Sequence, residues 1–377
     1  MDISLSEEQE LLQGSARDFL QKECPIRVVR AMEEDDKGYD PSLWKQMADL
    51  GWLGLVLPEE YGGSGGTMMD LVVLLEEFGR ALVPGPFVPT VVQVELPILW
   101  AGDDQQKRTY LPKLAQGELI GTMAWHEPSA TSEPWGIETT ASAQGESYIL
   151  NGIKLCVPYA HIADCLLTVA RTATGAAPVD GVTLFLVDAK SPGIEINKLG
   201  TIADDHQCEV VLNHVRASRR QVLGEPGKGW ALVEQVRRYG AVAKCAEMVG
   251  IAQQAFDISL NYAKTRVQFG RPIGSFQAIK HKLANMVIDV DGSRYVTYRA
   301  AWLLSEGLPA GHEIAVAKAW TNEACRRVVK EGQQVHGGIG YTREYDLQLY
   351  TRRAKAAEIA FDDSDTHREA VATSLGL

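Results

Sequence analysis

The spacing of apolar residues changes twice along the chain, and the changes predict three successive regions. Before about residue 121, apolar residues recur at helical spacing, beginning after a capping-box pattern at Ser6 and Gln9. From residue 122 to 229, short apolar runs alternate with Gly, Pro and Asp, which is typical of strands. After Trp230 the helical spacing returns and continues nearly to the end of the sequence.

The middle region is predicted to form a small β-sandwich or barrel. Two apolar runs, 147–150 and 153–157, flank Asn151-Gly152, a dipeptide that strongly favours a hairpin turn. Further strands of similar length are predicted over residues 165–170, 182–187 and 209–212. Short strands separated by turn residues are typical of sandwiches and barrels.

The last region contains four long helical patterns, at about 230–265, 274–305, 312–336 and 346–374, which predict a four-helix bundle. A chain of 377 residues is also too long for one ordinary core. The predicted fold is therefore α+β in three domains: an N-terminal helical domain (1–121), a middle β-sandwich or barrel domain (122–229) and a C-terminal four-helix bundle (230–377).

Composition and charge exclude several function classes. The chain is 45% hydrophobic and 23% charged, a balance typical of a globular enzyme. It carries 49 acidic and 37 basic side chains, for a formal net charge of −12. This excess repels nucleic acid and anionic membrane surfaces. An anionic ligand would therefore need arginines placed close to its own site.

The cysteines and the apolar runs bear on metal sites and location. None of the six cysteines forms a CxxC pair or has a metal-like spacing with histidine, so we expect reduced thiols and no metal site. No run reaches about 18 apolar residues, and the acidic N-terminal residues do not resemble a signal peptide. The sequence predicts a cytoplasmic protein with no membrane span.

The most informative stretch is residues 266–277, Arg-Val-Gln-Phe-Gly-Arg-Pro-Ile-Gly-Ser-Phe-Gln. It ends one helical pattern and leads into the next. Arg266 could pair with a pyrophosphate through two parallel hydrogen bonds, and Gln277 could contact the same ligand or a neighbouring subunit. The alternative is a solvated arginine at a helix end beside a packed Phe269.

This stretch resembles the acyl-CoA dehydrogenase motif RxQFGxPIxxxQ, and the resemblance extends over essentially the whole chain. Residues 123–133 resemble the family's TEPxxGSD loop, and residues 150–154 resemble the strand before the flavin contacts. Residues 334–341 resemble QxxGGxGY, and residues 350–355 resemble the LxRxAK segment that follows. The order and spacing of these motifs together identify the chain as a member of this family.

The resemblance implies an FAD site shared between subunits. The residues implied to hold the FAD of a neighbouring subunit are Arg266, Phe269, Gln277, Gln334, Gly337 and Gly338. His126, Ser132 and the backbone of Val157 are implied to lie near the flavin, and Ser132 also near the acyl-CoA. His126 replaces the usual Thr or Ser, and its alternative role is that of a capped loop histidine.

The strand at the flavin also departs from the family pattern. Cys156-Val157-Pro158 stands where the family often has Trp-Ile-Thr. Proline removes a backbone N–H donor, so the flavin contacts of this strand are expected to differ from the common pattern.

The catalytic carboxylate is not where the family usually has it. The usual glutamate follows the Lys of RxAK by six residues, which here gives Phe361, and the other known location gives Gly240. Three explanations remain open: Asp362 acts as the base after a one-residue shift, another carboxylate reaches the site, or this chain is the base-lacking subunit of a heteromeric enzyme. Asp362-Asp363 can also be read as a helix N-cap, and His367 as a surface helix residue.

The function implied is that of an FAD-dependent acyl-CoA dehydrogenase, which removes an α-proton and passes a β-hydride to flavin N5. The backbone N–H of Phe361 would donate to the thioester oxygen, and Gly240 would contact the substrate. We expect a cyclic, steroid- or aromatic-derived acyl-CoA, an electron-transfer flavoprotein or similar acceptor, and a homotetramer or heterotetramer. The alternatives are a base-lacking partner subunit and a related flavin-dependent elimination on the same fold.

Overall fold

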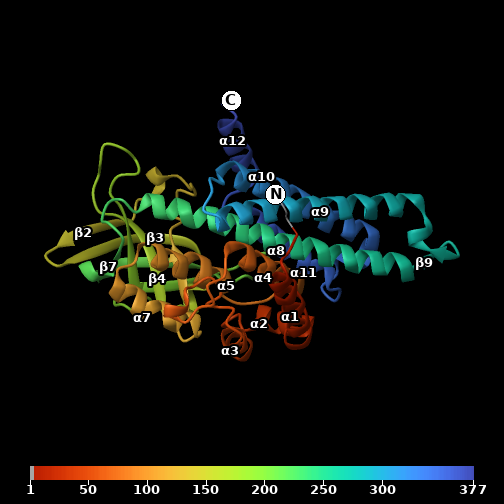
Figure 1. The fold of residues 1–377 in the computed structure, drawn as a ribbon, viewed down its shortest axis with the longest axis horizontal. Helices are drawn as coiled ribbons and strands as arrows, with labels where there is room; N and C mark the ends of the chain where they lie inside the picture. The colour runs from red at the N-terminus through yellow and green to blue at the C-terminus, as the bar shows by residue number, and fades with distance from the viewer. Residues whose placement is uncertain (1–3) are drawn as a thin grey trace. The chain divides into compact units, whose positions relative to one another are not determined.

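The computed structural model describes residues 4–377, which divide into two compact units (Figure 1). Unit 1 contains the residues up to Arg30, Thr67–Val83 and Ala241–Leu377. Unit 2 contains Ala31–Gly66 and Pro84–Gly240. No helix within residues 4–377 is long and apolar enough to cross a membrane.

Unit 1 is built almost wholly of helices. Their bounds are α1 (Glu7–Glu23), α4 (Met68–Ala81), α9 (Gln277–Ser305), α10 (Gly311–His336), α11 (Leu347–Ile359) and α12 (Ser364–Ser374). The helices α2 (Ile26–Glu34) and α8 (Trp230–Thr265) begin in one unit and end in the other. The predicted capping box of α1 is confirmed: Gln9 N–H donates to Ser6 Oγ, and Ser6 N–H donates to Gln9 Oε1.

Helices α4 and α8 cross with their backbones in contact. A Cβ on Gly79 would lie 1.9 Å from the carbonyl oxygen of Glu247, and one on Gly250 would lie 1.9 Å from that of Glu76. Only glycine permits this approach at both positions. The Glu76 carboxylate is buried and accepts hydrogen bonds from Arg294 and Tyr298 of α9. Three helices are therefore fixed at this crossing.

The last predicted helix, 346–374, is wrong as a single element. It is two helices, α11 and α12, separated by a turn in which Phe361 and Asp362 have φ values of 55° and 75°. Left-handed backbone cannot continue an α-helix, so the chain changes direction there. The break falls at the position where the sequence analysis looked for a catalytic carboxylate.

Unit 2 contains one eight-stranded sheet with the strand order β6-β7-β3-β2-β4-β5-β8, and β1 pairs with β4 in parallel. The bounds are β1 (Gly121–Ala124), β2 (Thr140–Gln144), β3 (Ser147–Pro158), β4 (Cys165–Arg171), β5 (Val182–Asp188), β6 (Ile194–Leu199), β7 (Gln207–Ser218) and β8 (Val222–Leu223). The strands predicted near 165–170, 182–187 and 209–212 are confirmed, whereas the sequence analysis missed β1, β2, β6 and β8.

The predicted hairpin at Asn151-Gly152 is wrong, because both residues lie inside the continuous strand β3. The register against β7 shifts there, because two residues of β7, Asn213 and His214, lie opposite Asn151 alone, so the bulge is in β7. The Asn151 Oδ1 atom accepts a hydrogen bond from the backbone N–H of His214 at 2.8 Å. The tight turn is instead at residues 145–146, where Gln144 of β2 pairs with Ser147 of β3.

Unit 2 also contains several short helices. They are α3 (Pro41–Asp49), α5 (Phe87–Thr90), a π-helical segment at Val91–Glu95, α6 (Leu96–Ala101) and α7 (Asp104–Ala115). The core of unit 2 contains residues from α6, α7, β1, β4 and β5 and from the first turns of α8. The strands contribute buried apolar side chains to this core, among them Met123, Leu167, Val169, Leu184 and Leu186.

Candidate functional site

The motif at residues 266–277 forms a tight hairpin between α8 and α9. Its strands are β9 (Val267–Gln268) and β10 (Arg271–Pro272), joined by Phe269 and Gly270 at φ values of 53° and 76°. Two consecutive left-handed residues are typical of a type I′ turn. The Phe269 side chain is 92% exposed. The hairpin therefore presents a mostly exposed aromatic ring, whose neighbour is the Phe276 ring at a centroid distance of 6.1 Å.

The base of this hairpin is closed by backbone hydrogen bonds around Arg266. Its N–H donates to Tyr262 O at 2.8 Å, and its carbonyl accepts from Ile273 N at 2.8 Å. The Arg271 guanidinium lies 4.2 Å from the centroid of the Phe276 ring. Arg266 and Gln277 are both exposed, at the two ends of the hairpin. The alternative in the sequence analysis was a solvated arginine beside a packed Phe269. The arginine is exposed as that alternative states, but Phe269 is exposed too.

An aromatic cluster brings the predicted glycines to the same end of the bundle. The rings of Tyr262 on α8 and His336 on α10 stack with centroids 4.3 Å apart, and Tyr345 packs on both. Burial lowers the pKa of His336. Because Tyr262 is one turn before Arg266 and His336 precedes Gly337, the arginine and the glycine pair lie at one end of unit 1.

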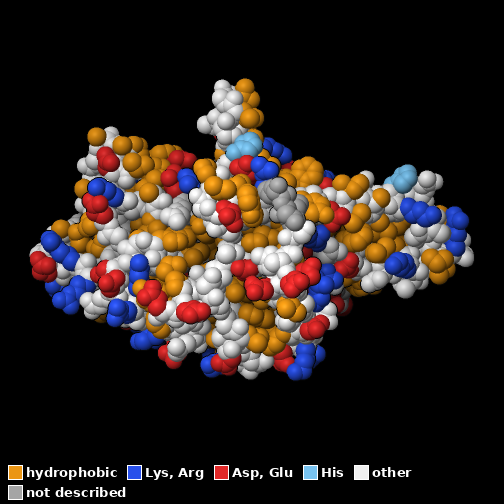
Figure 2. All heavy atoms as spheres, viewed as in Figure 1, with side chains coloured by type: hydrophobic (Ala, Val, Ile, Leu, Met, Phe, Trp, Pro, Cys, Tyr) orange, Lys and Arg blue, Asp and Glu red, His pale blue; other side chains and the backbone are white. Residues whose placement is uncertain are grey.

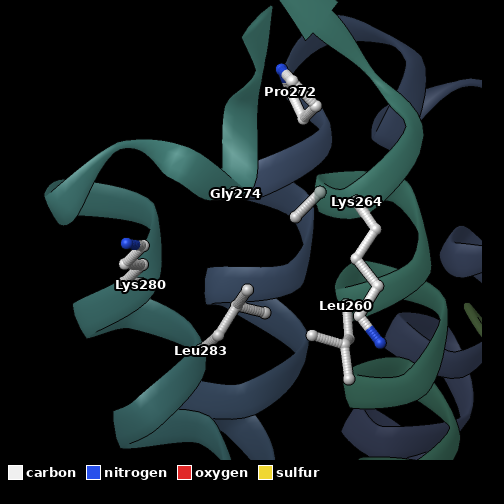
Figure 3. A pocket seen from close by; sticks show the side chains of 7 residues that line it. Leu260, Lys264, Pro272, Gly274, Lys280 and Leu283 are labelled. Carbon is white, nitrogen blue, oxygen red and sulfur yellow. The ribbon is translucent and has the colours of Figure 1, made fainter.

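A cavity of about 450 Å³ lies beneath the hairpin (Figure 3). Apolar atoms of Leu260 and Leu283 line it, and the two lysines Lys264 and Lys280 reach it from α8 and α9. Figure 2 shows Lys and Arg side chains gathered at the end of the molecule that carries β9. The sequence analysis missed both lysines, although each lies within three residues of the motif.

The second candidate region is the turn between α11 and α12. Phe361 is buried and Asp362 is partly buried. The α12 N-cap is Asp363, whose carboxylate accepts from Thr366 N–H at 2.9 Å. The N-cap role therefore belongs to Asp363 and not to Asp362. His367 is a partly exposed residue of α12, and its Nε2–H donates to Phe361 O at 2.9 Å.

The turn also rests on a lysine that the sequence analysis missed. Lys318 of α10 is fully buried, and its Nζ donates to the carbonyls of Ala357 and Glu358 at the end of α11. A lysine in a helical pattern gives no signal of this role, because its acceptors lie about 40 residues further along the chain.

The third candidate region is the loop between β1 and β2 in unit 2. Glu127 in this loop and Lys154 on β3 form a buried ion pair at 2.6 Å. The same carboxylate accepts from the backbone N–H groups of Glu138 and Thr139. Burial lowers the pKa of Lys154 to about 8. The pair ties both ends of the loop to the sheet, and so explains why the motifs contain a glutamate and a lysine.

The predicted flavin residues of unit 2 lie on this framework. His126 O accepts from Leu155 N–H of β3 at 2.9 Å, and the His126 ring lies 3.8 Å from that of Trp125. Val157 is buried two residues further along β3, after a bulge in which Cys156 has a φ of 51°. His126 and Val157 are therefore brought together, and Ser132 lies partly buried in the same loop.

Two further expectations concern Gly240 and metals. Gly240 is a buried residue of α8. Among the residues that the structure describes, no group of three or more His, Cys, Asp or Glu side chains could hold a metal ion. All six cysteines are free, as the sequence analysis predicted.

Comparison with known proteins agrees with this arrangement. Three family models match: the N-terminal domain of acyl-CoA dehydrogenase at residues 6–118, the middle domain at 122–215 and the C-terminal domain at 227–376. The chain is 34% identical to a probable acyl-CoA dehydrogenase of Bacillus subtilis, YngJ, over the full length of both proteins. It is 33% identical to a 3-(aryl)acrylate reductase of Clostridium sporogenes, with 98% of this chain and 99% of the relative covered.

A solved structure supports the same assignment. The ChsE4-ChsE5 complex from Mycobacterium tuberculosis superposes with a TM-score of 0.91 at 27% identity, covering 100% of this chain and 99% of the other. The three domain models match the N-terminal, middle and C-terminal parts of the chain. A relative with more than 30% identity covers its full length. The chain belongs to the acyl-CoA dehydrogenase family of flavin-dependent oxidoreductases.

Proposed function

We propose that this chain binds FAD and catalyses α,β-dehydrogenation of a CoA thioester. The observation that carries the proposal is the exposed Arg266 hairpin at the same end of unit 1 as Gly337-Gly338. A Cβ on either glycine would meet no atom within 4 Å, so there is open space for a ligand against the backbone. An unpaired cationic hairpin on a chain of net charge −12 fits a diphosphate.

In this proposal, separate groups of residues would bind the cofactor and act on the substrate. Arg266, Phe269, Gln277, Gln334, Gly337 and Gly338 would hold the FAD of a neighbouring subunit. His126, Ser132 and Val157 would face the flavin of this subunit. When bound, FAD supplies the hydride acceptor. The Phe361 N–H would donate to the thioester oxygen, and Asp362 would accept the α-proton.

We infer an aromatic or cyclic acyl group as the substrate class. The name of the Clostridium sporogenes relative, a 3-(aryl)acrylate reductase, supports an aryl-substituted acyl chain. A shorter base than glutamate also suits an α-carbon that lies closer to the turn. An electron-transfer flavoprotein is the proposed electron acceptor, and the cytoplasm is the proposed location.

A second candidate function is that of a base-lacking subunit paired with a related chain. The observation that favours it is Phe361, a buried apolar side chain at the family's glutamate position. The similarity to the ChsE4-ChsE5 complex, which contains two different chains, supports a heteromeric assembly. In that case the carboxylate would come from the partner.

One experiment separates the two functions. The purified chain is expected to carry bound flavin, and anaerobic 3-phenylpropionyl-CoA should bleach its visible absorbance, whereas free 3-phenylpropionic acid should not. The free acid lacks both the binding energy of CoA and the acidified α-proton. Bleaching that appears only after co-expression with a related chain would favour the partner-subunit function. Equal bleaching by ester and acid would contradict both.

Arg266→Ala is expected to release flavin on dilution. The loss of one charge-assisted hydrogen bond to a diphosphate costs about 1.5–3 kcal/mol, or roughly 10- to 150-fold in affinity. The measurement is the FAD content per chain after gel filtration at decreasing protein concentration. Arg299→Ala is the matched control, because Arg299 is an exposed arginine of α9 that pairs with Glu313. Full retention of flavin by Arg266→Ala would exclude this residue from the FAD site.

A further inference from the structure

Lys318 is a fully buried lysine whose amine is surrounded by oxygen. Its Nζ donates hydrogen bonds to Asn322 Oδ1 at 2.8 Å, Ala357 O at 3.0 Å and Glu358 O at 3.2 Å. Its relative exposure is 0%. Burying a lysine is costly unless its donors are all paired. Three oxygens around Nζ match the three N–H groups of an ammonium ion.

Two of these acceptors are carbonyls of the last turn of α11. Such carbonyls have no partner within their own helix, and their alternative partner is water or a capping group. Here a side chain from α10 takes that role. Lys318 therefore fixes the end of α11 and, with it, the direction in which residues 360–363 leave the helix.

The turn held in this way is unusual for its residues. Phe361 and Asp362 both have positive φ, a conformation that is costly for an apolar aromatic residue. Contacts with the surrounding helices must offset the conformational free energy that these two residues cost. His367 holds the Phe361 carbonyl from α12, and Lys318 holds the preceding carbonyls from α10.

The charge of Lys318 also bears on the turn. Burial lowers its pKa to about 8, so the amine is mostly protonated at neutral pH. The groups that face it are Cys245 and Lys244 of α8, Glu358 of α11 and Asp362 of the turn. Burial raises the pKa of the Cys245 thiol to about 11, so that thiol is neutral. At neutral pH the carbonyls of Ala357 and Glu358 therefore accept their hydrogen bonds from an ammonium ion.

We propose that Lys318 is a positioning residue, which holds the Phe361 N–H in place for a thioester oxygen. The proposal rests on the proposed function for the identity of the ligand. The positioning of the turn does not depend on it. Lys318 would touch neither substrate nor cofactor, and would act only through the last turn of α11.

The first test measures the turn itself. In the flavin-loaded protein, Lys318→Met is expected to speed amide hydrogen exchange of a peptide covering residues 356–367 by about tenfold or more, because two helix-end carbonyls lose their donor. Lys330→Met, an exposed lysine of the same helix, is the control and should leave this exchange unchanged. Faster exchange throughout unit 1 would mean general destabilisation and would overturn a local role, as would unchanged exchange at residues 356–367.

The second test measures ligand discrimination by titration calorimetry with cinnamoyl-CoA and free CoA, which differ by the acyl carbonyl and its substituent. Lys318→Met should weaken cinnamoyl-CoA binding about tenfold and leave CoA binding within about twofold. Equal weakening of both would overturn the thioester role. If Lys318→Met does not fold, Lys318→Gln keeps a donor and should show the same pattern more weakly. If the wild type binds neither probe, the proposed function fails, and the exchange result still decides the positioning of the turn.

Discussion

Asp362→Asn is expected to lower the rate of flavin reduction by an acyl-CoA about 10²- to 10⁴-fold, the usual contribution of a general base. Asparagine tolerates the left-handed backbone that Asp362 adopts, with its φ of 75°, so the fold of the turn should be kept. FAD content should be unchanged. The measurement is anaerobic stopped-flow reduction with 3-phenylpropionyl-CoA.

The neighbouring carboxylate provides a matched control. Asp363 caps α12, and asparagine is as good an N-cap as aspartate, so Asp363→Asn should keep near wild-type rates. A wild-type rate in Asp362→Asn would mean that the base lies elsewhere. Activity only in the presence of a related chain would support the partner-subunit function instead.

Lys154→Met is expected to destabilise unit 2 by about 3–5 kcal/mol, because it leaves the Glu127 carboxylate buried without its counter-ion. The two side chains are 0% and 3% exposed, and the ion pair is 2.6 Å long. The backbone N–H groups of Glu138 and Thr139 would still bind the carboxylate, but they carry no full charge. The measurement is the shift of the urea midpoint followed by tryptophan fluorescence.

A surface pair in the same unit is the control for this second variant. Lys198 pairs with Asp36 at 3.1 Å, with side-chain exposures of 43% and 104%. Lys198→Met should change stability by no more than about 1 kcal/mol, because water screens exposed ion pairs. Equal urea midpoints for the two variants would show that the buried pair contributes no more than the exposed one.

The sequence predicted the long helices and their ends well where the signals are local. The Ser6/Gln9 box, the stop at Thr265 and the start at Gln277 depend on residues within a few positions of one another. Local backbone chemistry is enough to predict these ends. The hairpin within the motif was not predicted: the sequence analysis had residues 266–277 only as a connection between two helices, and the structure shows the strands β9 and β10 there.

The candidate site was predicted only in part, for a physical reason. Motif positions located residues 266–277, the glycine pair and Phe361-Asp362, but not the hairpin or the turn that these residues form. They did not reveal Lys318 or the acceptors that it binds, because a buried amine and its carbonyls are brought together by packing between helices. The choice of Asp363 over Asp362 as the cap also depended on where α12 begins.

Burial of other charged groups was likewise decided by packing. Glu95 is 0% exposed, and neither of its carboxyl oxygens has a hydrogen-bond partner among residues 4–377. Burial raises its pKa well above the ordinary value. Nothing in the run Val-Glu-Leu-Pro distinguishes this glutamate from an exposed one, because its environment comes from other segments.

By itself, the sequence determined the order of helical and β regions, the position of the motif at residues 266–277 and the absence of a carboxylate at the two usual family positions. Hydrophobic periodicity and turn preferences depend on residues that are close in sequence, so both can be recognised from the sequence alone. The tertiary structure alone decided that Asn151-Gly152 continues a strand, because it lies along β7, whose His214 N–H donates to the amide oxygen of Asn151. It alone paired Glu127 with Lys154 and brought Lys318 to the end of α11, since those contacts join residues 27 to 40 positions apart.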